Sequence, residues 1–318
     1  MAYLEKSNMK GEREMSYAIG IDIGGTKTAI ALVTDTGTLV EKQILKTEGS
    51  AAPRVMIDQM AHAVNDILKN NQLLVADLIG IGIGAPGPLD VTKGQITNPP
   101  NLPAWEGAPL VEMIKAHFPL TRIRLENDAN AAAVAEKWVG AAQNVDTFVY
   151  MTISTGIGGG LYANGRPVFG SRGNGGEVGH IVIDSNGPLC TCGLRGCFEA
   201  VASGTAIAEL GSKIKGQALT TKDVFALYEA GDAEMTPFVN DVFEKIGIGC
   251  VSMINLFDPE LIVLGGGVTN VGQPLFDAVK AFTEKFALNP AGRDTPIVPS
   301  GLDQDTGVIG AAALIFAD

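Results

Sequence analysis

The sequence is poor in cysteine, histidine, aromatic residues and positive charge, and it has no long apolar run. Its 318 residues include four cysteines and three histidines, and Phe, Trp and Tyr together make up 6%. No run of about 18 apolar residues occurs, so a transmembrane helix is not expected. The first fifteen residues are charged and lack the apolar core of a signal peptide. We therefore expect a cytoplasmic protein without a membrane partner, and a disordered N-terminal extension over residues 1–15.

The scarcity of positive charge bears on possible partners. The chain has 23 lysines and arginines against 35 acidic residues, which gives a formal net charge of -12. A surface of this sign repels nucleic acid and anionic membranes, so no nucleic-acid partner is expected. An anionic substrate would require a pocket that is locally positive.

Glycine and apolar residues, by contrast, are abundant. There are 40 glycines, well above the average share of about 7%. Because 46% of the residues are hydrophobic, the glycine excess predicts tight turns and close backbone approaches, not disorder. A chain of this length can form one large or two ordinary domains with real cores.

The stretch IDIGGTKT, residues 21–28, resembles a phosphate-binding loop. It is not a Walker P-loop, because Thr26 stands where the motif requires lysine when counting begins at Gly20. The residues that follow predict a strand, a turn at 35–37 and another strand, so the glycines belong to a hairpin.

Such a hairpin has the groups that a phosphate needs. Gly24 and Gly25 let phosphate oxygens approach the backbone, while Thr26 and Lys27 add donors. Asp22 would point into the same cleft. An ordinary glycine-rich hairpin is the alternative interpretation of this fragment.

The same pattern recurs half a chain later. Residues 147–168 again predict a strand, a glycine-rich turn at 156–160 and a second strand, and a third glycine cluster at 265–267 follows a buried strand. The repetition suggests two related α/β lobes with a nucleotide between them. We expect an N-terminal lobe over residues 16–121 and a larger C-terminal lobe over 122–304. A final helix at about 305–318 is expected to pack back on the first lobe.

A cluster of soft metal ligands is the most specific signal. His180, Cys190, Cys192 and Cys197 form the pattern H-x9-C-x-C-x4-C in a loop rich in turn formers. This pattern predicts a closed, structural zinc site. The alternative is a disulfide beside a core histidine, but a C-x-C pair can scarcely bridge itself without strain. Cys250, in an apolar helix, is expected to be a small buried residue.

Acidic residues flank this metal loop. Glu177 lies three residues before His180, and Glu199 lies two residues after Cys197. Carboxylates fixed in this way suit hydrogen bonds to adjacent sugar hydroxyls, and the second ring nitrogen of His180 could join them. Without a metal frame, both glutamates would be interpreted as solvated surface acids.

The stretch RLENDANAAA predicts a strand that enters an alanine-rich helix. Asp128 could be the N-cap of that helix, since aspartate and asparagine are preferred there. At the carboxyl end of a strand beside a phosphate cleft, Asp128 could equally accept a hydroxyl proton while Asn127 orients the acceptor. The sequence leaves both interpretations open.

Together these motifs resemble the ROK family of sugar kinases and repressors, from about Tyr17 to the C-terminus, and most of all its bacterial glucokinases. The zinc loop GEVGH…CTCGLRGCFE is the most specific part of the resemblance. It implies an α/β, actin-like (ribonuclease H-like), two-lobed sugar kinase fold with a structural zinc loop.

The resemblance also implies a role for each matching residue. Asp128 is the expected catalytic base, and Asp22 is expected to help hold Mg2+ through water. The expected sugar contacts are Gly87, Asn127, Asp128, Glu177, His180 and Glu199. The expected contacts to phosphates and adenosine are Gly24, Gly25, Thr26, Lys27, Thr155, Gly156, Gly265 and Gly266.

The activity implied is ATP-dependent phosphorylation of glucose to glucose 6-phosphate. The alternatives are a kinase for N-acetylmannosamine, N-acetylglucosamine or fructose, a polyphosphate-dependent kinase, and, less expected, a sugar-sensing regulator. Regulators of the family carry a winged-helix domain before the first hairpin, whereas only fifteen residues precede Ser16. The resemblance also suggests a homodimer.

Overall fold

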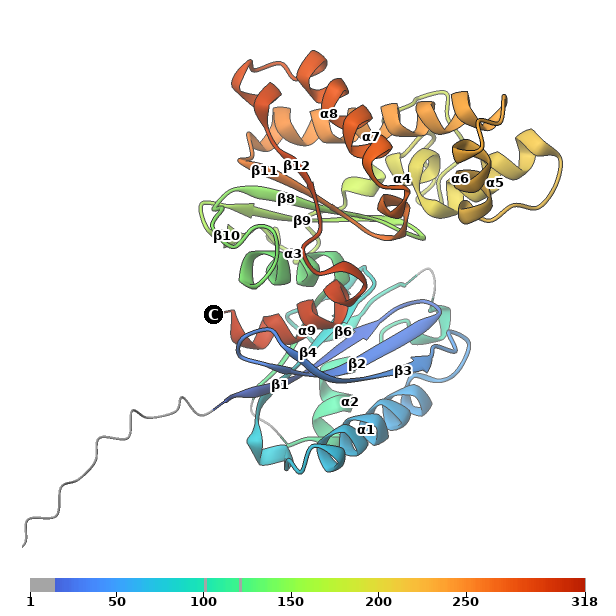
Figure 1. Cartoon of the computed structure of the whole chain (residues 1–318). Helices are drawn as coiled ribbons and strands as arrows, with labels where there is room; N and C mark the ends of the chain where they lie inside the picture. The colour runs from blue at the N-terminus through green and yellow to red at the C-terminus, as the bar shows by residue number, and fades with distance from the viewer. Residues whose placement is uncertain (1–14, 100–101, 120–121, 318) are drawn as a thin grey trace, which may run out of the picture.

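The computed structural model describes residues 15–99, 102–119 and 122–317. The extension expected at the N-terminus therefore lies outside the described residues, apart from the exposed Met15. The chain folds into two α/β layers that stack with two helices between them (Figure 1). None of the helices within the described ranges is long and apolar enough to cross a membrane.

The first sheet has the strand order β3-β2-β1-β4-β7. Its strands are β1 (Tyr17–Ile23), β2 (Lys27–Thr34), β3 (Leu39–Lys46), β4 (Leu78–Ala85) and β7 (Ile123–Asn127). The first three strands form an antiparallel meander, and β4 and β7 continue parallel to β1. Helices α1 (Pro53–Asn70) and α2 (Leu110–His117) cover its outer face (Figure 1). The small strands β5 (Leu89–Asp90) and β6 (Gln95–Ile96) pair with each other beside it.

The second sheet repeats this plan with the order β10-β9-β8-β11-β12. Its strands are β8 (Phe148–Ile153), β9 (Ile157–Ala163), β10 (Arg166–Pro167), β11 (Leu261–Gly265) and β12 (Ile297–Pro299). Its helices are α4 (Phe198–Ala202), α5 (Gly204–Lys215), α6 (Thr221–Glu229), α7 (Met235–Phe257) and α8 (Gln273–Phe286). Short 3-10 helices occupy Val75–Asp77, Pro103–Trp105, Val178–His180, Gly267–Val271, Ala291–Asp294 and Asp303–Asp305.

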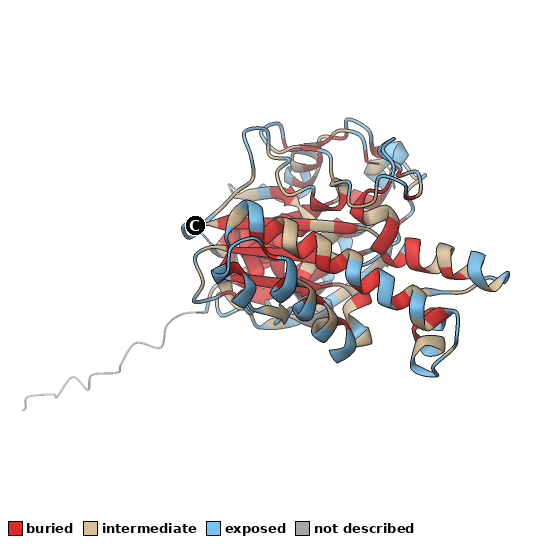
Figure 2. Ribbon diagram, turned by 90° about the horizontal axis from the view of Figure 1, so that it is seen from above, coloured by how far each residue is buried: buried red, intermediate tan, exposed pale blue. Residues whose placement is uncertain are grey.

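Helices α3 (Asp128–Trp138) and α9 (Thr306–Phe316) lie between the two sheets (Figure 1). Most residues of both helices are buried, so the apolar alanine-rich sequences face protein on nearly all sides. Figure 2 shows the same contrast, since burial is concentrated in the sheets and central helices while outer helices are exposed on one side. The two-lobed α/β fold is thus confirmed.

The position of β7 differs from the expected division of the chain. The expected boundary between the lobes lies near residue 121, yet β7 pairs with β4 over Ile81–Ala85 and completes the first sheet. The first sheet therefore extends to Asn127, and the chain leaves it where α3 begins. The pairing of β7 joins strands about 40 residues apart, a long-range contact that local sequence patterns do not reveal.

Candidate active site

The junction between β7 and α3 presents two adjacent polar residues. The Asn127 side chain accepts hydrogen bonds from the Ala129 amide at 3.0 Å and from the Asn130 amide at 3.2 Å. Asn127 is therefore the N-cap, and the alternative that Asp128 caps the helix is wrong. Asp128 is the first helical residue, and one of its oxygens accepts the Ala129 amide at 2.8 Å.

The Asp128 carboxyl group has a raised pKa and therefore binds a proton more tightly than an ordinary aspartate. Burial and, to a smaller extent, the nearby charges of Asp22 and Glu177 together raise its pKa from 3.8 to about 7, against the opposing effect of the Ala129 amide hydrogen bond. A carboxylate with a pKa near neutrality can accept a proton from a hydroxyl group and release it again. The geometry thus makes Asp128 suitable as a general base.

Asp22 lies close to Asp128 across a glycine. A Cβ added at Gly84 would lie 3.8 Å from Oδ1 of Asp22 and 3.7 Å from Cα of Asp128. Burial raises the pKa of Asp22 to about 6, although the positive charge of Lys27 opposes this shift. Carboxylate oxygens in such a place are the ligands that Mg2+ prefers, directly or through water. Asp22 therefore fits a position on the metal-phosphate side of a site.

Gly87, Asn127 and Glu177 meet at one corner of the candidate site. A Cβ added at Gly87 would lie 3.4 Å from Nδ2 of Asn127 and 3.5 Å from Oε1 of Glu177. An amide donor and a carboxylate acceptor thus converge on a bare stretch of backbone. This combination can bind a hydroxyl group that both donates and accepts.

Glu199, at the start of α4, is tied to the second glycine turn. Its Oε2 accepts the Ile157 amide at 2.9 Å and would lie 2.4 Å from a Cβ added at Gly156. Glu199 is therefore not a freely solvated acid, because one of its oxygens holds the β8–β9 hairpin. The turn needs glycine at position 156 to leave room for this carboxylate.

The four predicted metal ligands converge. The ligand atoms of His180, Cys190, Cys192 and Cys197 all lie within 4.8 Å of one another. Sγ of Cys192 is 3.5 Å from Sγ of Cys197, and Sγ of Cys190 is 3.6 Å from Nδ1 of His180. A tetrahedral zinc ion with ordinary bond lengths gives edges of about 3.5–3.8 Å, so the donor set fits the ion.

The state of the cysteines and the orientation of His180 agree with a metal cluster. All the cysteines are free, which removes the alternative of a disulfide. Cys250 is buried in α7 apart from the cluster, as predicted, and burial raises its pKa to about 12. Because Nδ1 of His180 faces the sulfur atoms, Nε2 is the ring nitrogen that a substrate could meet.

The metal loop is fixed against the second hairpin. Gly179 approaches β9 so closely that a Cβ there would lie 2.1 Å from the Ile157 carbonyl oxygen. On the other side of the loop, Val182 pairs with Cys197 as an isolated β-bridge. The loop therefore holds Glu177 and Glu199 in place relative to the second sheet.

The three glycine clusters lie at strand ends, as predicted. In the first, the Gly24 amide donates to the Lys27 carbonyl at 2.9 Å and closes the β1–β2 hairpin, leaving Thr26 and Lys27 exposed. In the second, the Thr155 carbonyl accepts a 2.8 Å hydrogen bond from the Thr205 hydroxyl. This bond links the turn to the start of α5.

The third cluster continues β11 beside the end of β8. Gly265 pairs with Thr152, and Gly266 has a φ of 88°. A Cβ added at Gly266 would lie 2.4 Å from the Ile153 carbonyl oxygen, so only glycine fits there. The second and third clusters thus lie side by side on one lobe, whereas the first belongs to the other.

One contact of the site was missed by sequence reasoning. A Cβ added at Gly307, in the first turn of α9, would lie 2.3 Å from Oδ2 of Asp22. The glycine is visible in the sequence, but its closeness to Asp22 follows from a fold contact between residues almost 300 positions apart.

A cavity of about 780 Å³ lies behind β7. It is lined by Leu125, Tyr162 and Phe169 among others, and none of the predicted site residues lines it.

Comparisons with known proteins show which family the chain belongs to. The sequence matches the ROK family over residues 18–317. A glucokinase of Halalkalibacterium halodurans is 34% identical over 312 residues, which cover 93% of this chain and 94% of the glucokinase. An N-acetylmannosamine kinase of Yersinia pestis is 34% identical over 304 residues, which cover 94% of this chain and 98% of that kinase. A xylose repressor of Bacillus subtilis is 29% identical, over 96% of this chain and 78% of the repressor.

Solved structures give the same result. A ROK hexokinase from Thermus thermophilus superimposes with a TM-score of 0.80 at 35% identity, over 93% of this chain and 97% of that one. A ROK glucokinase from Streptomyces griseus, in complex with glucose and AMPPNP, has a TM-score of 0.78 at 27% identity, over 94% and 99% of the two chains. Because the family match spans nearly the whole chain and the fold agrees with solved members, the chain belongs to the ROK family.

Proposed function

We propose that this protein is an ATP-dependent sugar kinase and that glucose is its preferred acceptor, with glucose 6-phosphate as the product. The observation that carries the proposal is the position of Asp128. This partly buried carboxyl group has a pKa of about 7 and lies near both Asp22 and the Asn127–Glu177 corner. A base that lies near an acid on the phosphate side and near a corner that can bind a hydroxyl group suits phosphoryl transfer to an alcohol.

The donor would lie between the glycine clusters. The first hairpin and the turn at Thr155 and Gly156 would hold the phosphates, because glycine backbone and the Thr26 and Lys27 side chains offer donors to oxygen atoms. Gly265 and Gly266 would leave room for the adenosine at the end of β11. Asp22 would hold Mg2+ through water, and the bound ion would neutralise charge on the phosphates.

The acceptor would lie against the metal loop. Asn127, Glu177, Nε2 of His180 and the remaining oxygen of Glu199 would bind the sugar hydroxyls, with Gly87 providing close approach of the backbone. Zinc held by His180 and the three cysteines would fix this loop and take no part in the chemistry, since a closed four-ligand site leaves no position for water.

The proton transfer follows from this arrangement. Asp128 would take the proton of the 6-hydroxyl as that oxygen bonds to the γ-phosphorus, while the bond from the γ-phosphorus to the bridging oxygen breaks and ADP leaves. The loose transition state leaves alignment as the main contribution of the protein. Closure of the two lobes would exclude water, which would otherwise consume ATP by hydrolysis.

The choice of sugar has a second candidate. The N-acetylmannosamine kinase of Yersinia pestis is as similar to this chain as the Halalkalibacterium halodurans glucokinase, at 34% identity. The width of the site beside the sugar 2-position separates the two, because an N-acetyl group needs space that a hydroxyl does not. The resemblance of NPPNLPAW to the sugar-side loop of glucokinases favours glucose, although residues 100–101 of that loop lie outside the described residues.

Coupled ADP release with Mg-ATP tests the proposal. The acceptors are glucose, mannose, fructose, N-acetylglucosamine and N-acetylmannosamine, with polyphosphate as an alternative donor and Asp128→Asn as the control. We expect a strong preference for glucose, and no turnover in the variant. A preference for an amino sugar would keep the mechanism and change the substrate, whereas no turnover on any sugar would favour a sugar-binding regulator. Light scattering of the same preparation tests the expected homodimer.

A further inference from the structure

The carboxyl-terminal end of α3 carries a buried carboxylate that the proposed chemistry does not use. Glu136 is 0% exposed, and it is absent from the ion pairs found across the described ranges. A buried carboxylate without a cation is costly unless hydrogen bonds satisfy it. An apolar residue would fill the same space at lower cost, so the charge itself calls for an explanation.

The hydrogen bonds of Glu136 join two segments that are far apart in the sequence. Its Oε2 accepts the Ala141 amide at 2.7 Å, in the turn that follows α3. Its Oε1 accepts the Ser300 hydroxyl, and the Gly301 amide lies 3.2 Å from both oxygens. One carboxylate therefore binds the end of α3 to the segment that leads from β12 into α9.

One glycine makes room for this carboxylate, and a second makes room for the turn that the carboxylate binds. A Cβ added at Gly140 would lie 2.1 Å from Oε2 of Glu136, and one added at Gly301 would lie 2.8 Å from the Ala141 nitrogen. The local sequence is thus adapted to a charged group at this point. The close packing also fixes the distance between the two segments.

The segment from residue 300 to 305 connects the two lobes. Near its start, the Ser300 hydroxyl lies 3.2 Å from the Thr306 hydroxyl, which opens α9. At its end, Asp305 pairs with Lys42 of β3, in the first sheet, at 2.5 Å. Glu136 therefore holds the start of this connection on α3, and Lys42 holds its end on the first sheet.

The two helices that Glu136 joins both begin at the proposed site. Helix α9 begins beside Asp22, because Gly307 lies against the Asp22 carboxylate. Helix α3 begins with Asp128. We propose that Glu136 is a positioning residue that sets Asp22 relative to Asp128 by holding the start of α9 on α3. This inference rests on the proposed function, in which Asp22 serves the donor and Asp128 the acceptor.

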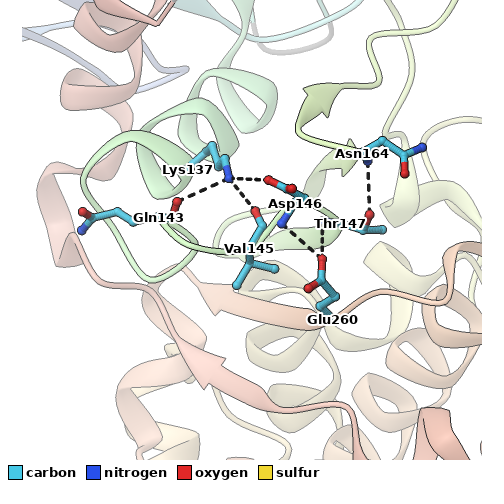
Figure 3. A network of polar contacts seen from close by, with 7 residues as sticks. All are labelled: Lys137, Gln143, Val145, Asp146, Thr147, Asn164 and Glu260. Carbon is cyan, nitrogen blue, oxygen red and sulfur yellow. Dashed lines mark hydrogen bonds and ion pairs between the residues drawn. The ribbon is translucent and has the colours of Figure 1, made fainter.

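Lys137, the next residue, provides a matched control. Its ammonium group donates to the carbonyls of Gln143 and Val145 at 3.3 and 2.8 Å and to Asp146 at 3.1 Å (Figure 3). Asp146 and Thr147 are in turn held by Glu260, through amide hydrogen bonds of 3.2 and 2.9 Å (Figure 3). Lys137 thus anchors the end of α3 to residues 143–146, just before β8, and among the described residues none of its hydrogen bonds reaches the connection to α9.

The test compares Glu136→Gln with Lys137→Met in the full chain. Glutamine keeps the shape of glutamate but presents an amide group to a site that requires only acceptors. We expect Glu136→Gln to lower kcat by about 10-fold to 100-fold, since small misplacements of reacting groups cost this much, with both KM values within about threefold. Lys137→Met should keep kcat within about threefold of the wild type, even if its thermal midpoint falls as far as that of Glu136→Gln.

A fall in kcat no larger than that of Lys137→Met would overturn the proposal. A rise in both KM values together with the fall in kcat would also overturn it, because that pattern indicates general loosening of the site. Ser300→Ala removes one bond to Glu136 and serves where Glu136→Gln does not fold. It should give the same split between kcat and KM in weaker form, and unchanged kcat would again overturn the proposal.

Hydrogen exchange provides a readout that does not need turnover. Glu136→Gln should raise exchange together at residue 141, at residue 301 and in the first turn of α9, and Lys137→Met should not. Independent behaviour of these segments would overturn the proposal even in an active enzyme. A wild-type protein that phosphorylates no sugar would instead refute the proposed function, and the exchange comparison would still decide whether Glu136 joins α3 to α9.

Discussion

Replacing Asp128 by asparagine should make the protein inactive and more stable at the same time. Asparagine has the same shape, and its side-chain oxygen can still accept the Ala129 amide that now lies 2.8 Å from Asp128. What the substitution removes is a charge. Because that charge is held in a partly buried place beside Asp22 and Glu177, its removal should relieve a cost of folding.

The sign and size of the effect follow from the pKa. The Asp128 pKa is raised from 3.8 to about 7, so between these values the folded state binds a proton that the unfolded chain has lost. The contribution of Asp128 to the stability of the wild type therefore falls as the pH rises from about 4 to about 7. A shift of about three units corresponds to an upper bound of about 4 kcal/mol. Because the side chain retains some contact with water, we expect a gain of about 1–3 kcal/mol at pH 8 for Asp128→Asn.

Urea unfolding at pH 8 and pH 5, together with coupled ADP release, measures both effects. The gain in stability should be largest at pH 8 and clearly smaller at pH 5, where the wild-type carboxyl group is protonated in the folded state. Turnover should fall by about 10²- to 10⁴-fold, the usual contribution of a general base. Loss of stability at pH 8 would refute the argument from burial, and near-normal turnover would refute the assignment of Asp128 as the base.

Three further results are expected. Below pH 7, kcat/KM for the sugar should fall about tenfold per pH unit, because Asp128 with its pKa of about 7 becomes protonated; a profile flat down to about pH 5.5 would contradict this. Removal of zinc by a chelator, or Cys192→Ser, should raise the sugar KM far more than the ATP KM, and unchanged sugar kinetics in metal-free protein would count against the metal loop as the sugar support. Gly266→Ala should lower stability by about 1–3 kcal/mol, because φ is 88° and the new Cβ would lie 2.4 Å from the Ile153 carbonyl oxygen. Gly267→Ala, where a Cβ meets nothing within 4 Å, is its control in thermal unfolding.

Local patterns predicted much of the fold and of the candidate site. The two glycine hairpins, the four-ligand cluster and the strand-to-helix junction at Asp128 were all visible, because each depends on residues close in the sequence. The sequence offered Asp128 as the capping residue, whereas Asn127 is the N-cap, because two preferred capping residues stand side by side there and only the backbone geometry chooses between them.

Contacts between distant segments could not be predicted in the same way. Nothing near Glu136 in the sequence indicates that its carboxylate meets Ser300 and Gly301, because the residue lies in a helix where glutamate is a common surface residue. Its neighbour Lys137 looks equivalent in the sequence, yet it binds a different segment. Burial on nearly all sides of α3 is a property of the assembled fold.

Two of the glycines inside strands have a specific cause in the way α9 packs. A Cβ added at Gly82 would lie 1.7 Å from the Ala311 carbonyl oxygen, and one added at Gly20 would lie 2.1 Å from that of Val308. The helix backbone therefore rests directly on β1 and β4, and any side chain at either glycine would push the helix away from the sheet. A displaced α9 would move Gly307 away from Asp22 and would also strain the connection held by Glu136. Strand glycines remote from any substrate thus determine where the donor side of the proposed site lies, which explains why this chain uses glycine inside strands despite its cost there.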